Sequence, residues 1–156
     1  MAGHNIEATF FCLGKNVEEH PEIYQRILAE GHAVGNHSYS HPSGWKTKNE
    51  DYFKDVKKGN KTVQSKIFRP PYGRITRSQA NKLKGEYNII MWNVLSGDYD
   101  EKVSPERCLS NVVDNTESGS IIVFHDSEKA EQSLRYALPK AIEMLLVKGF
   151  KFGIIE

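Results

Sequence analysis

Short apolar segments alternate with longer amphipathic segments along the whole chain. The apolar segments are rich in β-branched and aromatic residues and end at glycine, proline or polar residues, which is typical of buried strands. We expect such strands at residues 6–14, 32–38, 67–70, 87–94, 120–126 and 150–155. The amphipathic segments between them predict helices over residues 20–31, 49–66, 76–86, 104–119 and 133–149.

This alternation predicts an α/β fold in which helices cover a parallel sheet. A barrel and an open sheet both fit the pattern. The chain has 156 residues, enough for one domain with a hydrophobic core, and it contains no linker and no long repeat. We therefore expect a single domain over residues 1–156.

Polar residues of chemical interest come directly after the expected strands. His37 and His41 follow the second strand, residues 69–73 the third and residues 96–100 the fourth, and His125 lies near the end of the fifth. The carboxyl ends of parallel strands open on one face of the fold, where active sites of α/β proteins lie. These four segments are therefore expected to form one site.

His37 and His41 are the first candidate ligands for a metal. Neutral imidazole is a common zinc ligand, and a catalytic zinc ion usually takes three protein ligands and leaves one position for water. A spacing of four places both rings on one side of a helical turn. Two polar residues on a surface loop would give the same pattern, and the first carboxylates after the pair, Glu50 and Asp51, suggest no third ligand.

The other three segments also have both a structural and a functional interpretation. The prolines of "FRPPYG" hold Arg69 and Tyr72 on a stiff loop, which is either a rigid turn or a binding loop. Asp98 follows a glycine in an expected turn, where Asp is common for backbone reasons, and Trp92 lies in an expected strand. His125 ends an apolar strand, which suits acid–base chemistry as well as a core histidine bonded to backbone.

Composition narrows the function classes. Lys plus Arg number 21 and Asp plus Glu 20, and this balance gives no support to a nucleic acid or an anionic membrane as partner. No apolar run has the length of a transmembrane helix, and the first residues lack the features of a signal peptide. Cys12 and Cys108 belong to no paired motif, so we expect buried thiols.

Taken in order, these segments resemble the polysaccharide deacetylase family of carbohydrate esterases. "HSYSH" is similar to the family's His-[Ser/Thr]-x-x-His metal motif at His37 and His41. "RPPY" is similar to its Arg-x-Pro-Tyr motif at Arg69, Pro71 and Tyr72.

Two further motifs extend the resemblance over nearly the whole chain. "SGDY" resembles the family's Asp-Ser-x-Asp-Trp region at Asp98, with Leu95 where an acid is common and Tyr99 where Trp is usual. "IVFH" resembles its Leu-x-x-His motif at His125, and "ATFFCLGKNVEEHPE" its second strand and following helix.

The family fold is a distorted (β/α) barrel that opens with a Thr-Phe-Asp-Asp-Gly motif, whose aspartates serve as catalytic base and third metal ligand. The present sequence starts only a few residues before "ATFF". The resemblance therefore implies a barrel of this type with its first βα unit missing, so that the third ligand is not found in this chain. An unpaired sheet edge would offer a surface for homo-oligomer formation.

The resemblance implies a metal-dependent hydrolase that removes N-acetyl or O-acetyl groups from a polysaccharide such as an N-acetylglucosamine polymer, outside the cytoplasm or in the cell envelope. It implies that His37 and His41 bind a divalent metal, Zn²⁺, which acidifies water. Pro71 and Tyr72 would contact the substrate, and the backbone N–H of Tyr72 would stabilise the oxyanion.

The remaining roles follow from the same resemblance. His125 would donate a proton to the leaving amine and Asp98 would orient it. Arg69 would steady the base aspartate, and Trp92 would face the sugar ring. Two alternatives stay open: a catalytically impaired carbohydrate-binding relative, and an unrelated α/β domain with structural histidines.

Overall fold

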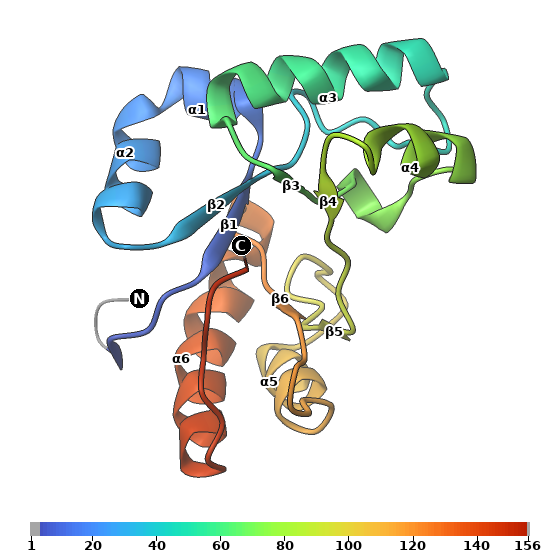
Figure 1. Ribbon diagram of the computed structural model, residues 1–156. Helices are drawn as coiled ribbons and strands as arrows, with labels where there is room; N and C mark the ends of the chain where they lie inside the picture. The colour runs from blue at the N-terminus through green and yellow to red at the C-terminus, as the bar shows by residue number, and fades with distance from the viewer. Residues whose placement is uncertain (1–3, 156) are drawn as a thin grey trace. The chain divides into compact units, whose positions relative to one another are not determined.

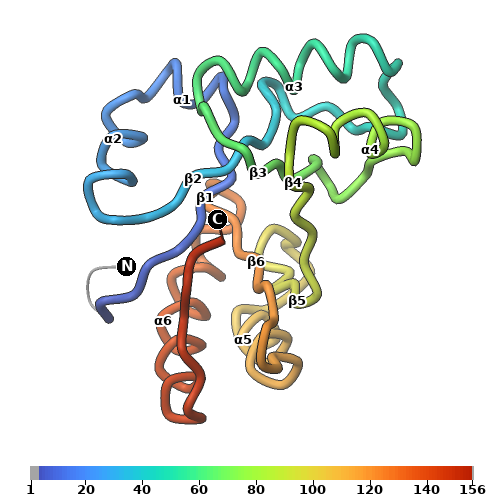
Figure 2. Tube along the Cα trace, in the orientation of Figure 1, coloured from blue at the N-terminus to red at the C-terminus, as the bar shows by residue number. Residues whose placement is uncertain are grey.

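The computed structural model describes residues 4–155 of the chain, which is traced in Figures 1 and 2. The chain divides into two compact units. The first comprises residues 1–91 and 152–156, and the second comprises residues 92–151. The expectation of a single domain stays a prediction, and residues 1–3 and 156 lie outside the described part.

The first unit is built on a four-stranded parallel sheet. Its strands are β1 (Thr9–Cys12), β2 (Ala33–Asn36), β3 (Ile67–Phe68) and β4 (Asn88–Ile89), in the order β1-β2-β3-β4. Every neighbouring pair is parallel. This arrangement confirms the α/β class and the parallel sheet that the alternation predicts.

Four α-helices belong to the described part of this unit: α1 (Gly14–Glu19), α2 (Pro21–Ala29), α3 (Asn49–Val63) and α4 (Arg77–Leu83). The short helix α1 was not expected, since it lies directly after β1 within a stretch assigned to strand and loop. Thr76 begins α4 with a capping box, in which its side chain and that of Gln79 satisfy each other's backbone N–H groups. Helix α3 packs against β2, α1 and α4, and leads back into β3 (Figure 2).

The core of the first unit lies under α3. Tyr52 and Val56 of α3 pack with Phe68 of β3 and with Leu83 and Tyr87 around the end of α4. The buried positions of α3 recur every three or four residues, so the helix turns one apolar face to the sheet and an exposed, mostly charged face outward.

The second unit contains a two-stranded parallel sheet and two helices. The strands are β5 (Val94–Leu95) and β6 (Ile122–Val123), and helix α5 (Pro105–Val113) packs on α6 (Glu131–Val147). Figure 1 shows α6 as the long helix of this unit, and it runs through Pro139 without interruption. Within residues 4–155, no helix combines the length and the apolar character that crossing a membrane requires.

Two strand predictions are wrong. Residues 87–94 form two short strands in different sheets, β4 and β5, rather than one strand. Residues 150–155 form no strand, and the Ile155 N–H donates to the side-chain hydroxyl of Thr9 at 2.8 Å. In both places the residues suit a strand, but a strand requires a partner backbone along its whole length.

Candidate active site

His37 and His41 lie on the loop after β2, with their imidazole rings edge to face. The two Nε2 atoms are 3.2 Å apart. Nδ1 of His37 lies 2.7 Å from the backbone oxygen of Arg69. Because a carbonyl only accepts hydrogen bonds, Nδ1 carries the proton, and neutral His37 presents the lone pair of Nε2 toward His41.

This geometry fits two ligands of one divalent metal. Around a tetrahedral zinc ion with Zn–N distances of about 2.0–2.1 Å, neighbouring ligand nitrogens lie roughly 3.3 Å apart. A backbone carbonyl on the other ring nitrogen is the usual outer partner of a metal-binding histidine. Among residues 4–155, no group of three or more His, Cys, Asp or Glu side chains lies together in a way that could hold a metal ion.

Buried polar side chains hold the backbone of this loop. Asn36 is fully buried; its Oδ1 accepts the Ser38 N–H at 2.9 Å and its Nδ2 donates to the backbone oxygen of Val56 at 3.0 Å. The Ser38 hydroxyl accepts the His41 N–H at 3.1 Å. Ser38 and His41 have φ values of 70° and 65°, in the left-handed region that residues other than glycine rarely adopt. These bonds therefore maintain a strained backbone, a common feature of binding sites.

Helix α3 supports the loop from outside. The Asp55 carboxylate accepts the N–H groups of Tyr39 and Ser40, at 2.9 and 3.1 Å, and the Ser40 hydroxyl at 2.6 Å. A Cβ atom at Gly59 would lie 2.5 Å from the carbonyl carbon and oxygen of Ser38, so only glycine allows this approach. Sequence reasoning did not identify Asp55 or Gly59 as supports of the loop. Their spacing of four on one helix is the signal that could have indicated a shared face.

The "FRPPYG" loop meets the same histidines. Arg69 is 8% exposed, and the Cζ atom of its guanidinium lies 3.9 Å from the centroid of the Phe11 ring. Burial lowers the pKa of Arg69 to about 10, so its side chain stays charged at neutral pH. Pro71 is buried, while Tyr72 has a φ of 58° and an exposed ring whose centroid lies 4.4 Å from that of His41. Five predicted site residues of the first unit thus lie together.

Asp98 and His125 form the corresponding group of the second unit. Asp98 is almost fully buried, and its two oxygens accept the His125 backbone N–H at 2.6 Å and Nδ1–H at 2.8 Å. The carboxylate thereby sets both the position and the tautomer of the ring, leaving Nε2 for proton exchange. The ring of Tyr99, which stands where the family motif usually has Trp, lies edge-on to His125 with centroids 4.9 Å apart.

Trp92 lies in the segment between β4 and β5 and is partly exposed. Its contact with a sugar stays a prediction.

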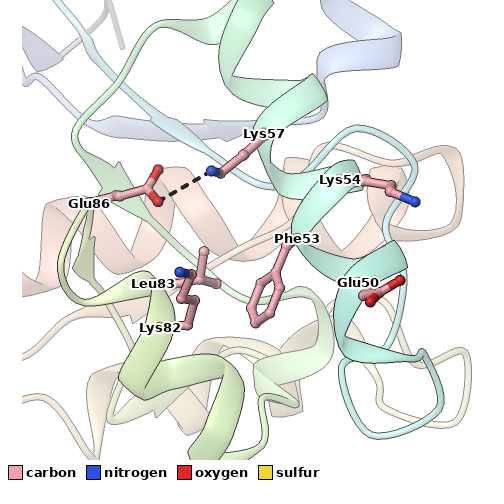
Figure 3. Close-up of a pocket in the computed structure, with 7 residues that line it drawn as sticks. All are labelled: Glu50, Phe53, Lys54, Lys57, Lys82, Leu83 and Glu86. Carbon is pink, nitrogen blue, oxygen red and sulfur yellow. Dashed lines mark ion pairs between the residues drawn. The ribbon is translucent and has the colours of Figure 1, made fainter.

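A separate groove of about 280 Å³ opens between α3 and α4, lined by Phe53, Leu83, three lysines and two glutamates (Figure 3). The ion pair of Lys57 with Glu86, at 3.4 Å, lies along it. Its lining contains no histidine or cysteine, so the candidate chemistry stays with the residues described above.

Comparison with known sequences identifies relatives of the chain. The model of the polysaccharide deacetylase family matches residues 1–87. The chain is 36% identical, over 96% of its own length and 57% of the relative's, to a peptidoglycan-N-acetylglucosamine deacetylase of Bacillus cereus. It is 33% identical to chitin deacetylase 2 of Saccharomyces cerevisiae, over 89% of the chain and 48% of that protein. The chain thus spans about half the length of these curated relatives.

Solved structures give the same result for the fold. A peptidoglycan N-acetylglucosamine deacetylase crystallised with an N-hydroxybenzamide compound superposes with a TM-score of 0.92 at 35% identity, covering 98% of this chain and 75% of that one. A family 4 carbohydrate esterase pseudoenzyme from Bacillus anthracis gives 0.85 at 27% identity, covering 98% and 55%. These matches confirm the deacetylase-type α/β fold that the motifs predict.

Proposed function

Because the chain belongs to the polysaccharide deacetylase family, we propose that it removes acetyl groups from an N-acetylglucosamine polymer, with peptidoglycan as the substrate class. Membership excludes the alternative of an unrelated α/β domain. The deacetylase names of the bacterial relatives support the choice of substrate. Peptidoglycan is a cell-wall polymer, so the proposed place of action is the cell envelope.

The observation that carries this proposal is the His37–His41 pair. Its Nε2 atoms have the separation of two metal ligands, and the backbone oxygen of Arg69 sets the tautomer of His37. The family is metal-dependent, and we assign His37 and His41 as two ligands of a divalent ion, Zn²⁺. Such an ion supplies a Lewis acid that polarises the acetyl carbonyl and lowers the pKa of water.

Residues around the pair have the chemistry for the other steps. We assign the backbone N–H of Tyr72 to stabilise the oxyanion, because its left-handed conformation fixes the direction of that peptide group on a stiff loop. Arg69 contributes a buried positive charge that would orient a carboxylate base. Pro71 fixes the backbone before Tyr72. In the second unit, we assign Trp92 to contact the sugar.

Breaking the amide also requires a proton for the leaving amine. We assign His125 as the general acid, which would donate this proton from Nε2 when its ring is protonated. Asp98 would keep Nδ1–H pointing at its own carboxylate, so that the exchangeable proton is always on Nε2.

Metal content and deacetylation of N-acetylglucosamine oligomers test the proposal together. We expect the wild-type protein to retain zinc after dialysis and to release free amines, and His37→Ala to lose both properties. His20→Ala is the matched control, because His20 is an exposed histidine between α1 and α2. A wild-type protein without metal, or a His37→Ala variant with full activity, would contradict the assignment.

A second candidate function is carbohydrate binding without turnover. One observation favours it: a pseudoenzyme of the same family has this fold. Binding of an oligomer with no release of amines, in a zinc-loaded sample, would support this candidate over the enzyme.

A further inference from the structure

An exposed aromatic surface continues from the His37–His41 loop. Trp45 and Tyr72 are 65% and 60% exposed, and the Arg74 guanidinium lies over both rings, 5.3 Å from the centroid of Trp45 and 5.9 Å from that of Tyr72. We call these three residues the aromatic ledge. Large exposed aromatic side chains that gather on one surface mark binding sites.

The ledge is rigid, although its rings face solvent. The Gly44 N–H donates to the backbone oxygen of Arg74 at 3.0 Å, and the fully buried Gln79 side chain donates to the Gly44 oxygen at 2.9 Å. A Cβ at Gly44 would lie 2.5 Å from the Arg74 oxygen, so the two loops are in direct backbone contact. The Trp45 indole N–H donates to the backbone oxygen of Ile75 at 3.3 Å. A surface held in this way loses little conformational entropy when it binds.

The ledge begins at the candidate catalytic residues. The Tyr72 ring lies against His41, and Arg74 continues from Tyr72 to Trp45. If one unit of a polymer were bound at His41, the neighbouring unit would therefore lie against the aromatic ledge. This continuity distinguishes Trp45 from isolated exposed hydrophobic residues such as Ile23 on α2.

The chemistry of the ledge suits a sugar ring. A pyranose has an apolar face of C–H groups, which stacks on an indole ring, and hydroxyl oxygens around its edge, which accept hydrogen bonds from a guanidinium fork. We propose that Trp45 and Arg74 form a second sugar subsite, which binds the unit of the polymer next to the one deacetylated. This inference rests on the proposed function, because the polymer is the substrate assigned there.

Substrate length tests the subsite. For the N-acetylglucosamine tetramer, we expect Trp45→Ala and Arg74→Ala each to raise KM roughly three- to tenfold with kcat unchanged. For the dimer, which occupies fewer subsites, KM should change much less. Trp45→Phe keeps a stacking ring and should give an intermediate KM, whereas Ile23→Ala, another exposed apolar side chain, should behave as wild type.

A binding measurement separates this inference from the proposed function. Calorimetric titration of the tetramer into His37→Ala, with and without Trp45→Ala, reports the subsite without any turnover. Weaker binding in the double variant, even if no sample deacetylates, would support the subsite while the proposed function fails. Equal binding with and without Trp45, or equal loss for dimer and tetramer, would overturn it. An Arg74 effect restricted to carboxylate-bearing peptidoglycan fragments would also overturn it, in favour of an anion site.

Discussion

The His37–His41 loop of the first unit and the Asp98–His125 pair of the second hold their imidazoles in different ways. The loop depends on several contacts, from the Asn36 and Ser38 side chains and from α3. The pair depends on one carboxylate, which accepts both the backbone N–H and the ring N–H of His125.

Backbone strain explains the difference. Ser38 and His41 both adopt left-handed conformations, each of which costs on the order of 1 kcal/mol for a residue with a side chain. In the second unit the left-handed position before Asp98 is occupied by Gly97, where there is no such cost. A strained loop needs many supports, whereas an unstrained one needs only a correctly placed partner. The comparison predicts that one substitution at the Asp98–His125 pair lowers activity more than one substitution at a support of the His37–His41 loop.

Asp98→Asn should have the largest effect. The two N–H groups of His125 bond to different oxygens of Asp98, and the substitution replaces one of these oxygens with an NH2 group, which cannot accept. One of the two hydrogen bonds that position the ring is therefore lost. We expect kcat for deacetylation to fall by about 10²- to 10⁴-fold. Asp100→Asn, an exposed turn residue of the same segment, is the control. Unchanged turnover in Asp98→Asn would show that the pair is structural.

Gly59→Ala tests the close approach of α3 to the backbone of the His37–His41 loop. The added methyl group would overlap the Ser38 carbonyl, so the loop or α3 must shift. We expect the free energy of unfolding to fall by about 1–3 kcal/mol, with loss of retained zinc. Gly85→Ala is the matched control, since its Cβ would meet only the Lys82 oxygen at 3.8 Å. Equal stability of the two variants in urea denaturation would argue against the tight approach.

Asp55→Ala should have a smaller effect, because the other supports of the loop remain. The N–H groups of Tyr39 and Ser40 would lose the Asp55 carboxylate as their shared acceptor, and the backbone that leads to His41 would be held less firmly. We expect zinc affinity to fall by about tenfold, the lower end of the range for outer partners of metal ligands. Competition with a chromogenic chelator measures this change, and Asp51→Ala on the same helix is the control. A fall as large as that of His37→Ala would mean that the loop depends on one contact after all.

Tyr52→Phe should have the smallest effect at neutral pH, and it tests the core beneath the loop. Within residues 4–155 the buried Tyr52 hydroxyl has no hydrogen-bond partner, so we expect its removal to change the free energy of unfolding by less than about 1 kcal/mol.

The same substitution should matter in alkali. Burial raises the pKa of Tyr52 far above its usual value of 10. The unfolded chain therefore loses this proton first as the pH rises above 10, and the wild type loses stability there. Denaturation at about pH 8 and about pH 11 should show a smaller loss for Tyr52→Phe than for wild type. Tyr99→Phe, an exposed tyrosine, is the control. Equal losses would contradict the burial of the hydroxyl.

The sequence by itself determined the alternation of strands and helices, the parallel sheet and the positions of the candidate residues after strands. These properties depend on local periodicity and on residues such as Pro70 and Pro71, whose backbone preferences act within a few positions. His37, His41 and Asp98 were therefore recognisable as candidates before any contact was known.

Only the tertiary structure decided what holds those residues. Asp55 and Gly59 meet the histidine loop because α3 packs over β2, and Trp45 meets Arg74 because the Gly44 N–H of one loop donates to the Arg74 oxygen of the other. Whether residues 87–94 and 150–155 form strands likewise depended on a partner backbone elsewhere in the chain. Contacts between residues far apart in sequence leave no local pattern, because their geometry is set by the packing of whole elements.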